Sequence, residues 1–422
     1  MDLVVLSIAS MLGVYALSMI LLYLLREKGD IFDPIPVSWA GYLIYIVLAM
    51  LSVSTSEVRR VSYDTRISGC ALTVLATFCY TIGLYAGRGQ LIARLIPAPA
   101  VSLNKGTFWV LWIISICGFL FTSFVSSYLN APLARVFNGI TLGFMGAATL
   151  ISLLAMLSLK KSLFSKVIMI ISSCFAVILF IQTFWSRRPL LGLAIAVLGF
   201  IYVFTFSGRR RAAKVAFVSV IVIFTLLLNL YLATSRGKRF YGRAAADQPF
   251  RPLSLDILTR LVPDVEIGYL AYEYALETIP SKYDYLYGSG IIPAFLFFIP
   301  RSLWPGKPVA TGYFISQLWF GKPDPESNLS PLPTGELYIN FGIFGLLLGT
   351  FLAGKAVRIT NAYLRQHSEN VVVWLAWLSI VPDFATEWRG DFTSISVQAF
   401  LRIIIFLGIV WLASRFFQQA SR

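Results

Sequence analysis

The feature that most constrains this chain is a series of apolar stretches, each close to the roughly 20 residues that an α-helix needs to cross a bilayer. Hydrophobic residues make up 58% of the 422 residues and charged residues only 13%, which is more apolar surface than a soluble core can bury. The sequence therefore predicts an all-α, polytopic membrane protein. We expect eleven spans, at about 2–25, 35–53, 67–87, 107–125, 137–158, 165–186, 188–206, 214–233, 334–357, 370–387 and 393–416.

A twelfth apolar run, at about 289–300, is too short to cross a membrane and contains Pro293. We expect a half-helix or an interfacial segment there. The predicted organisation has three parts: about eight spans in 1–233, one long loop in 234–333, and about three spans in 334–422. The loop is the only stretch outside the spans that is long enough to form a domain.

The net charge of +15 would suggest nucleic acid as a partner for a soluble protein. In a membrane protein it has a simpler reading, because cytoplasmic loops collect Lys and Arg. With the N-terminus outside and eleven crossings, the inner segments hold 17 Lys and Arg and the short outer loops hold 7. This bias places the long loop outside and predicts membrane lipids, not nucleic acid, as surroundings. The first spans fit least well, since Arg59, Arg60 and Arg66 then lie outside.

Acidic residues are distributed unevenly along the chain. None occurs between Thr65 and Ala246, whereas nine of the twenty fall within 234–333. A general acid or base is therefore expected from the long loop, from Glu336 just beyond it, or from the last outer loop.

An apolar stripe with helical spacing predicts a helix in the long loop that opens at Asp264. The stripe consists of Val265, Tyr269, Tyr272, Leu276 and Ile279. Glu266, Glu273 and Glu277 fall on another side of this helix, which we interpret as solvated.

The segment from Gly288 to Gly345 sets polar and aromatic residues between apolar runs. Arg301 and Lys307 have the charge to bind phosphate, and the rings of Trp304 and Tyr338 could stack on a sugar. Glu336 falls where a span begins, and an ionisable group there is costly enough to suggest a function. The alternative is a carboxylate that caps the N-terminus of the helix, where the helix dipole favours it.

The same segment resembles the Wzy-type polymerases of oligosaccharide repeat units, which make O-antigen or exopolysaccharide. The resemblance is carried by Pro300-Arg301-Ser302, Trp304-Pro305 and Lys307-Pro308, followed by Gly335-Glu336, Tyr338, Asn340-Phe341-Gly342 and Gly345. Elsewhere the similarity is mainly one of hydropathy. The resemblance implies a GT-C-like membrane fold and glycosyl transfer at the outer face of the cytoplasmic membrane. It implies undecaprenyl-diphosphate-linked oligosaccharide as substrate, with a flippase and a chain-length regulator as partners.

A donor of this kind already carries its diphosphate leaving group, so the expected reaction needs no ATP and no cofactor. Arg and Lys can neutralise the developing charge in place of a metal. The sequence has no Walker A motif, no Gly-x-Gly-x-x-Gly fingerprint, no Asp-x-Asp pair and no cluster with metal-ligand spacing. We expect Arg301 to stabilise the leaving group and Glu336 to act as base, with Asp264 and Glu266 as alternative bases.

Further cations are candidates for substrate binding. Arg187 and Arg188 join two spans on the outer side and match a lipid diphosphate, although a pair that snorkels to head groups would look the same. Arg260 lies in the long loop, and Arg389 either borders the site or belongs to a tight turn. Arg402 lies within the last span, where it is either functional or paired with Asp383 or Glu387.

Two other functions remain open from the sequence. An O-antigen ligase uses similar donors with a lipid A core acceptor, but its expected outer-face histidine is missing, since the only histidine, His367, falls in an inner loop. A flippase or transporter of lipid-linked oligosaccharide would show internal repeats and charged residues in several spans. We find no repeat, and ionisable residues within spans are nearly limited to Arg402 and Asp383.

Overall fold

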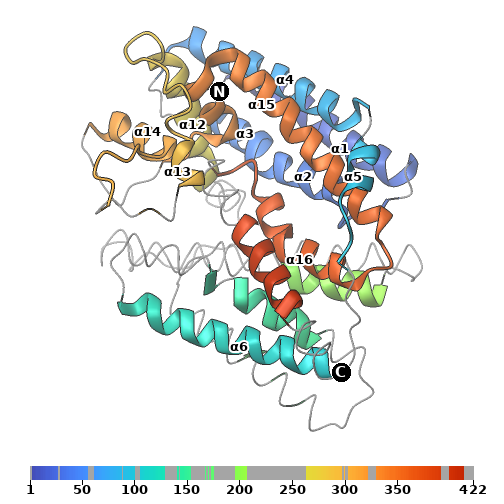
Figure 1. Cartoon of the computed structure of the whole chain (residues 1–422). Coiled ribbons are helices and arrows are strands. Elements are labelled where there is room, and N and C mark those ends of the chain that lie inside the picture. The colour runs from blue at the N-terminus through green and yellow to red at the C-terminus, as the bar shows by residue number, and fades with distance from the viewer. Residues whose placement is uncertain are drawn as a thin grey trace, which may run out of the picture. The chain divides into compact units, whose positions relative to one another are not determined.

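The computed structural model describes residues 2–26, 29–55, 61–87, 89–99, 105–128, 140–141, 143–153, 167, 170, 173–174, 195–206, 263–296, 299, 303–321, 329–390 and 399–412. Within these ranges every regular element is a helix and no strand occurs, so the all-α prediction is confirmed for them. The chain packs as two units, which we describe separately (Figure 1). Unit 1 comprises Met1–Ile96, Asp247–Gln366 and Phe384–Val397, and unit 2 comprises Pro97–Ala246, His367–Asp383 and Gln398–Arg422.

Four helices of unit 1 are long and apolar enough to cross a membrane. They are α1 (Leu3–Arg26), the continuous run of α2 (Pro34–Tyr42), η1 (Leu43–Val47) and α3 (Leu48–Thr55), then α4 (Tyr63–Tyr85) and α15 (Leu332–Gln366). These helices match four of the predicted spans in position, length and apolar character. The short element η1 is a π-helical turn within the second of them.

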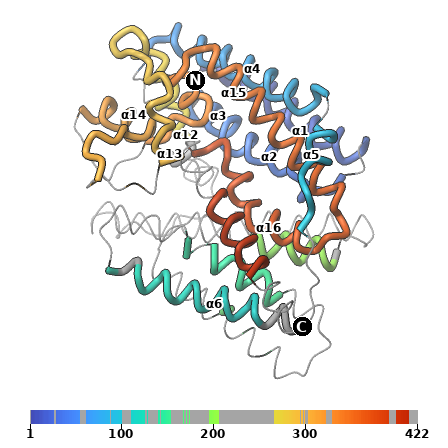
Figure 2. The backbone as a smooth tube through the Cα atoms, viewed as in Figure 1, coloured from blue at the N-terminus to red at the C-terminus, as the bar shows by residue number. Residues whose placement is uncertain are grey.

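Helices α4 and α15 run side by side and in the same direction, as the tube in Figure 2 shows. Two glycines allow the backbones to approach closely. A Cβ added at Gly83 would lie 2.0 Å from the carbonyl oxygen of Phe351, and one at Gly354 would lie 2.1 Å from that of Tyr80. Helix α15 ends only at Gln366. The helix therefore continues past the predicted end of its span at residue 357.

Polar contacts identify the two ends of unit 1. At one end, the backbone N–H of Asp2 donates to the carbonyl of Ser54 at 2.8 Å, so the start of α1 lies beside the end of α3. At the other end, the Tyr23 hydroxyl lies 2.7 Å from Asp33 Oδ2 and 2.9 Å from Asn361 Oδ1. Residues Pro34–Ser54 thus return the chain to the side where α1 began, as two crossings require.

The helix expected in the long loop is present as α12 (Pro263–Thr278), and its stripe residues Tyr269 and Tyr272 are buried within unit 1. The prediction that its glutamates face solvent is wrong for Glu273, whose exposed fraction is 0%. The reason is that α12 packs against α3, α4 and α15, so more than one of its faces is covered.

The apolar run at 289–300 contains only one short helix, α13 (Ile292–Phe295), which is much too short to cross. It is followed by α14 (Thr311–Phe320), which ends at Gly321 in the left-handed conformation, with φ of 66°. In unit 2 the described helices are α6 (Lys105–Tyr128), the π-helical turn η2 (Tyr202–Phe206), α16 (Val371–Ala385) and shorter apolar segments that include Ala399–Leu412. The predicted span at 165–186 lies largely outside the described residues, and the one at 214–233 lies wholly outside them.

Candidate functional site

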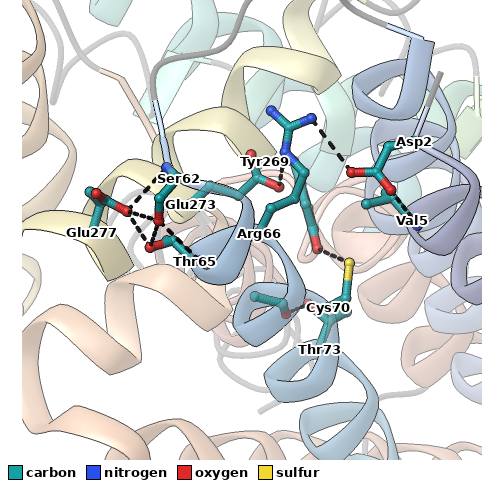
Figure 3. A network of polar contacts seen from close by, with 11 residues as sticks. Asp2, Val5, Ser62, Thr65, Arg66, Cys70, Thr73, Tyr269, Glu273 and Glu277 are labelled. Carbon is teal, nitrogen blue, oxygen red and sulfur yellow. Dashed lines mark hydrogen bonds and ion pairs between the residues drawn. The ribbon is translucent and has the colours of Figure 1, made fainter.

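The long-loop helix α12 carries a buried carboxylate into the end of unit 1 where α1 and α4 begin (Figure 3). Arg66 Nε lies 3.8 Å from Glu273 Oε1, and Arg66 Nη1 lies 3.9 Å from Asp2 Oδ2. Both Arg66 and Glu273 are buried. We call these three residues the Arg66 cluster. It links α1, α4 and α12 through one cation that lies between two carboxylates.

The Arg66 cluster holds Glu273 in an unusual electrostatic setting. No residue among those described donates a hydrogen bond to either oxygen of its carboxylate. Burial raises the pKa of Glu273 to about 7, because desolvation penalises the charged form; Asp2 adds to this rise and Arg66 opposes it. The carboxylate therefore changes charge near neutral pH, and with it the cluster changes between neutral and negative.

Glu277, one turn further along α12, contacts the start of α4. Its Oε2 accepts hydrogen bonds from Ser62 Oγ at 3.0 Å and from the Thr65 hydroxyl. Both hydrogen bonds lower the pKa of Glu277, and the bond from Thr65 has the larger effect. Ser62 is also the N-cap of α4, where its side chain accepts from the backbone N–H of Thr65. Glu277 thus fixes the beginning of α4 against the loop helix.

Beside the Arg66 cluster, Tyr269 and Cys70 join the middle of α12 to α4. The Tyr269 hydroxyl lies 3.7 Å from Cys70 Sγ, and both side chains are fully buried. Cys70 forms no disulfide. Within the part of the chain that the structure describes, no three His, Cys, Asp or Glu side chains gather as metal ligands.

The start of α15 holds the second buried carboxylate, that of Glu336, whose exposed fraction is 0%. Glu336 is the fifth residue of α15, so it lies past the first turn, where a capping carboxylate acts. On its N-terminal side Gly335 packs against Tyr272 of α12: a Cβ at Gly335 would lie 3.1 Å from the Tyr272 ring. This close approach places Glu336 beside the loop helix.

One turn after Glu336, Asn340 ties α15 to two parts of the long loop. Its side-chain Nδ2 donates to Thr311 Oγ1 at 3.0 Å and to the Glu336 carbonyl at 2.9 Å, and its Oδ1 accepts from the Gly290 N–H at 3.1 Å. Gly290 itself has no room for a side chain, since a Cβ would lie 2.4 Å from Thr311 Oγ1. We call Gly290, Thr311 and Asn340 the Asn340 bridge.

A kink in α15 follows the Asn340 bridge. Gly342 has φ of 67° and ψ of −160°, which is outside the helical range and favours glycine. Leu286 of the loop donates its N–H to the carbonyl of Ile339 at 3.0 Å. A Cβ at Gly342 would lie 3.3 Å from the Tyr285 ring, so the loop packs directly on the kink.

The aromatic and basic candidates of the motif are held by the loop backbone. Tyr338 is buried, and its hydroxyl donates to the carbonyl of Ile279 at 2.8 Å. Lys307 Nζ donates to the carbonyl oxygens of Leu296 at 2.7 Å and Ile299 at 2.9 Å. Trp304 is half-buried. These contacts order the loop, and the sugar and phosphate roles of the three residues stay predictions.

The remaining candidates divide into described and undescribed residues. Glu266 is half-buried and its Oε2 accepts from Ser52 Oγ at 2.9 Å. Arg389 lies in a turn, with its N–H donating to the carbonyl of Thr386 at 3.0 Å. Asp264 belongs to the first turn of α12, and its side chain is not described. Arg187, Arg188, Arg260 and Arg301 lie outside the described residues.

Arg402 pairs with Asp383, which is one of the two structural partners that the sequence analysis named for it. In unit 2, Arg402 Nη1 lies 3.1 Å from Asp383 Oδ2, and Asp383 is buried near the end of α16. This ion pair joins α16 to the helix that contains Arg402 and supports a structural role.

Two clusters of polar residues were not predicted from the sequence. The first is the Arg66 cluster. One sign of it is present in the sequence, because the charge bias places Arg66 on the outer side, where arginine is less common. The second, in unit 1, consists of Ser38, Tyr80 and Glu387, whose side chains are hydrogen-bonded together. Trp388 packs edge-on against Tyr80 beside it, with ring centroids 4.9 Å apart. No spacing in the sequence connects these residues, which come from three distant segments.

Comparison with protein-family models, curated proteins and solved structures finds no match for this chain. The fold defines only a class of protein: every regular element among the described residues is a helix, and four of these helices are long and apolar enough to cross a membrane. Within unit 1 a loop helix and the kinked start of α15 each bury a carboxylate.

Proposed function

We propose that this protein is a membrane glycosyltransferase that polymerises oligosaccharide repeat units carried on undecaprenyl diphosphate at the outer face of the cytoplasmic membrane. The observation that carries the proposal is the burial of Glu336 within a segment that resembles Wzy-type polymerases. Other residues of that segment, Asn340 and Gly342, tie the start of α15 to the long loop. A sequence that served only as a connection would need neither the buried charge nor the ties.

In the proposed reaction, the carboxylate of Glu336 accepts the proton of an acceptor sugar hydroxyl. The hydroxyl oxygen forms the new bond to the anomeric carbon of the growing chain. The bond from that carbon to the diphosphate oxygen breaks, and undecaprenyl diphosphate leaves with the electron pair. Arg301 neutralises the charge that develops on the leaving group.

Lys307 has a positioning role in this proposal. It binds the carbonyl oxygens of Leu296 and Ile299, which precede Arg301 in the chain. Its hydrogen bonds hold the backbone at Leu296 and Ile299. Lys307→Met should then lower the rate of transfer, because the backbone of Leu296 and Ile299 loses two hydrogen bonds.

The test is an assay of the purified chain with one defined lipid-linked repeat unit and no other substrate. A polymerase yields a ladder of lipid-linked products and one undecaprenyl diphosphate for each bond formed. A ligase makes product only after a lipid A core acceptor is added. A flippase in vesicles moves the substrate across the bilayer and forms no bond. Either of these last results would overturn the proposal.

A further inference from the structure

A groove with two arginines lies at the end of unit 1 where α4 finishes. Its volume is about 440 Å³, and its lining includes Tyr85 of α4, Gln90 and Arg94 of α5 (Gly89–Leu95), and Arg358 of α15. The tube of α5 runs beside the later half of α15 (Figure 2), and the two helices are in contact. Lys355 of α15 donates to the carbonyls of Ala86 and Gly87, which fixes the connection from α4 to α5.

The charge of the groove suits an anion. Its described lining contains two guanidinium groups and one amide but no carboxylate. The sequence also has no acidic residue between Thr65 and Ala246, so neither α5 nor its flanks can supply one. Arg94 is exposed and makes no ion pair with any described residue. Guanidinium groups offer paired N–H donors that match phosphate oxygens.

The apolar residues around the groove indicate that the phosphate belongs to a lipid. Leu91, Ile92 and Leu95 of α5 are exposed, Leu95 by 81%, and Tyr85 is exposed at the last turn of the membrane-spanning helix α4. A short helix with exposed aliphatic side chains next to cations is typical of a membrane interface. Acyl chains can cover the aliphatic residues while the head group meets the arginines. A free phosphate ion would leave that apolar surface uncovered.

The groove lies at the opposite end of α4 from the Arg66 cluster. Arg66 lies in the first turn of α4 and Tyr85 is its last residue, so they are about 28 Å apart along the helix, at ~1.5 Å per residue. That length is close to the thickness of a bilayer core, roughly 30 Å. The groove therefore lies at the level of the leaflet opposite to the Arg66 cluster. The charge bias predicts that this is the cytoplasmic leaflet.

We propose that this groove, between α5 and α15, binds the phosphate head group of an anionic phospholipid in that leaflet, through Arg94 and Arg358. The lipid would fasten α5 and α15 to the membrane surface. The proposal does not rest on the glycosyltransferase activity, because it uses residues at the other end of the bundle.

The experiment measures lipid binding to the detergent-solubilised full chain by native mass spectrometry. Phosphatidylglycerol and phosphatidylcholine with the same acyl chains serve as probes. We expect phosphatidylglycerol to bind about tenfold more tightly than phosphatidylcholine, which corresponds to ~1.4 kcal/mol. The double variant Arg94→Gln, Arg358→Gln should lose that preference. The control Arg26→Gln removes an exposed cation at the end of α1, on the same side of unit 1, and should keep the preference.

Three results would overturn the proposal. They are equal binding of the two lipids by the wild type, an unchanged preference in the double variant, and displacement of phosphatidylglycerol by millimolar inorganic phosphate. If the double variant fails to fold, the exposed single variant Arg94→Gln replaces it, and an unchanged preference there counts equally against the lipid site.

Discussion

Arg66 of α4 lies 3.8 Å from the buried carboxylate of Glu273 in α12, so an ion pair joins a membrane-spanning helix to the helix of the long loop. The same guanidinium lies 3.9 Å from Asp2 at the start of α1. Three segments far apart in the sequence are thus held at one end of unit 1 by a single cation.

Loss of that cation should loosen the loop helix. Arg66→Gln leaves two carboxylates without their counter-charge, and breaking a buried pair from one side costs about 3 kcal/mol. We expect a lower Tm in detergent and faster proteolysis within α12. The control Arg26→Gln changes an exposed arginine and should stay within about 0.5 kcal/mol of the wild type. Equal Tm values for the wild type and Arg66→Gln would show that the pair does not hold α12.

The pH dependence of stability should report the titration of Glu273. Its pKa is about 7 in the folded protein, whereas an unfolded glutamate has a pKa of ~4.3, so the folded state binds the proton more tightly. This contribution to stability is complete below about pH 4.3 and is lost as the pH rises through 7, on the order of 3 kcal/mol.

Melting curves between pH 4 and 8 can separate this effect from other titrations. Glu273→Gln should flatten the decline between pH 5 and 7. Glu277→Gln is the matched control on the same helix: the pKa of Glu277 is lowered, so its contribution is lost when the pH falls, and the decline should persist. If Glu273→Gln declines as the wild type does, another group is responsible.

The kink at Gly342 should tolerate no side chain. Alanine there must adopt φ of 67° and bring its Cβ to 3.3 Å from the Tyr285 ring, which costs about 1–3 kcal/mol in backbone strain alone. We expect Gly342→Ala to lower the Tm. Gly408→Ala is the matched control, because a Cβ at Gly408 meets nothing within 4 Å, and it should leave the Tm unchanged or raise it. Similar Tm values for the two variants would contradict the kink.

A double-mutant cycle can decide the role of Arg402, which pairs with Asp383 at 3.1 Å. If the pair is structural, Arg402→Met and Asp383→Asn each destabilise by about 3 kcal/mol, and the double variant recovers part of the loss. Transfer activity should then follow the Tm in all three variants. Activity that is lost in stable single variants and is not recovered in the double variant would instead make Arg402 part of the site.

The spans of unit 1 were predictable because a bilayer demands about 20 apolar residues from any crossing helix, wherever that helix packs. Helix α12 was predictable from the spacing of Tyr269, Tyr272 and Ile279. The burial of Glu273 was not, because a single stripe reveals one covered face and gives no sign that α4 covers another. The partner of Glu273 is separated from it by about two hundred residues, and no local pattern connects them.

The candidate site also combines residues that the sequence could predict with contacts that it could not. Glu336 was recognisable as an ionisable group at the start of a span. The hydrogen bonds of Asn340 to Gly290 and Thr311 depend on how the loop returns to α15, which spacing alone does not determine. The pairing of Arg402 with Asp383 could be named as an alternative, because few charges occur near the last spans.

The most direct test of the central claim compares Glu336→Gln with the wild type in single-turnover transfer from a defined lipid-linked repeat unit. The variant keeps the shape of the side chain but cannot accept the proton, so we expect the rate to fall by about 10²–10⁴-fold. Expression and Tm should stay close to the wild type. Glu369→Gln makes the same chemical change at an exposed position and should keep the full rate. A Glu336→Gln variant that makes long polymer at the rate of the wild type would contradict the account.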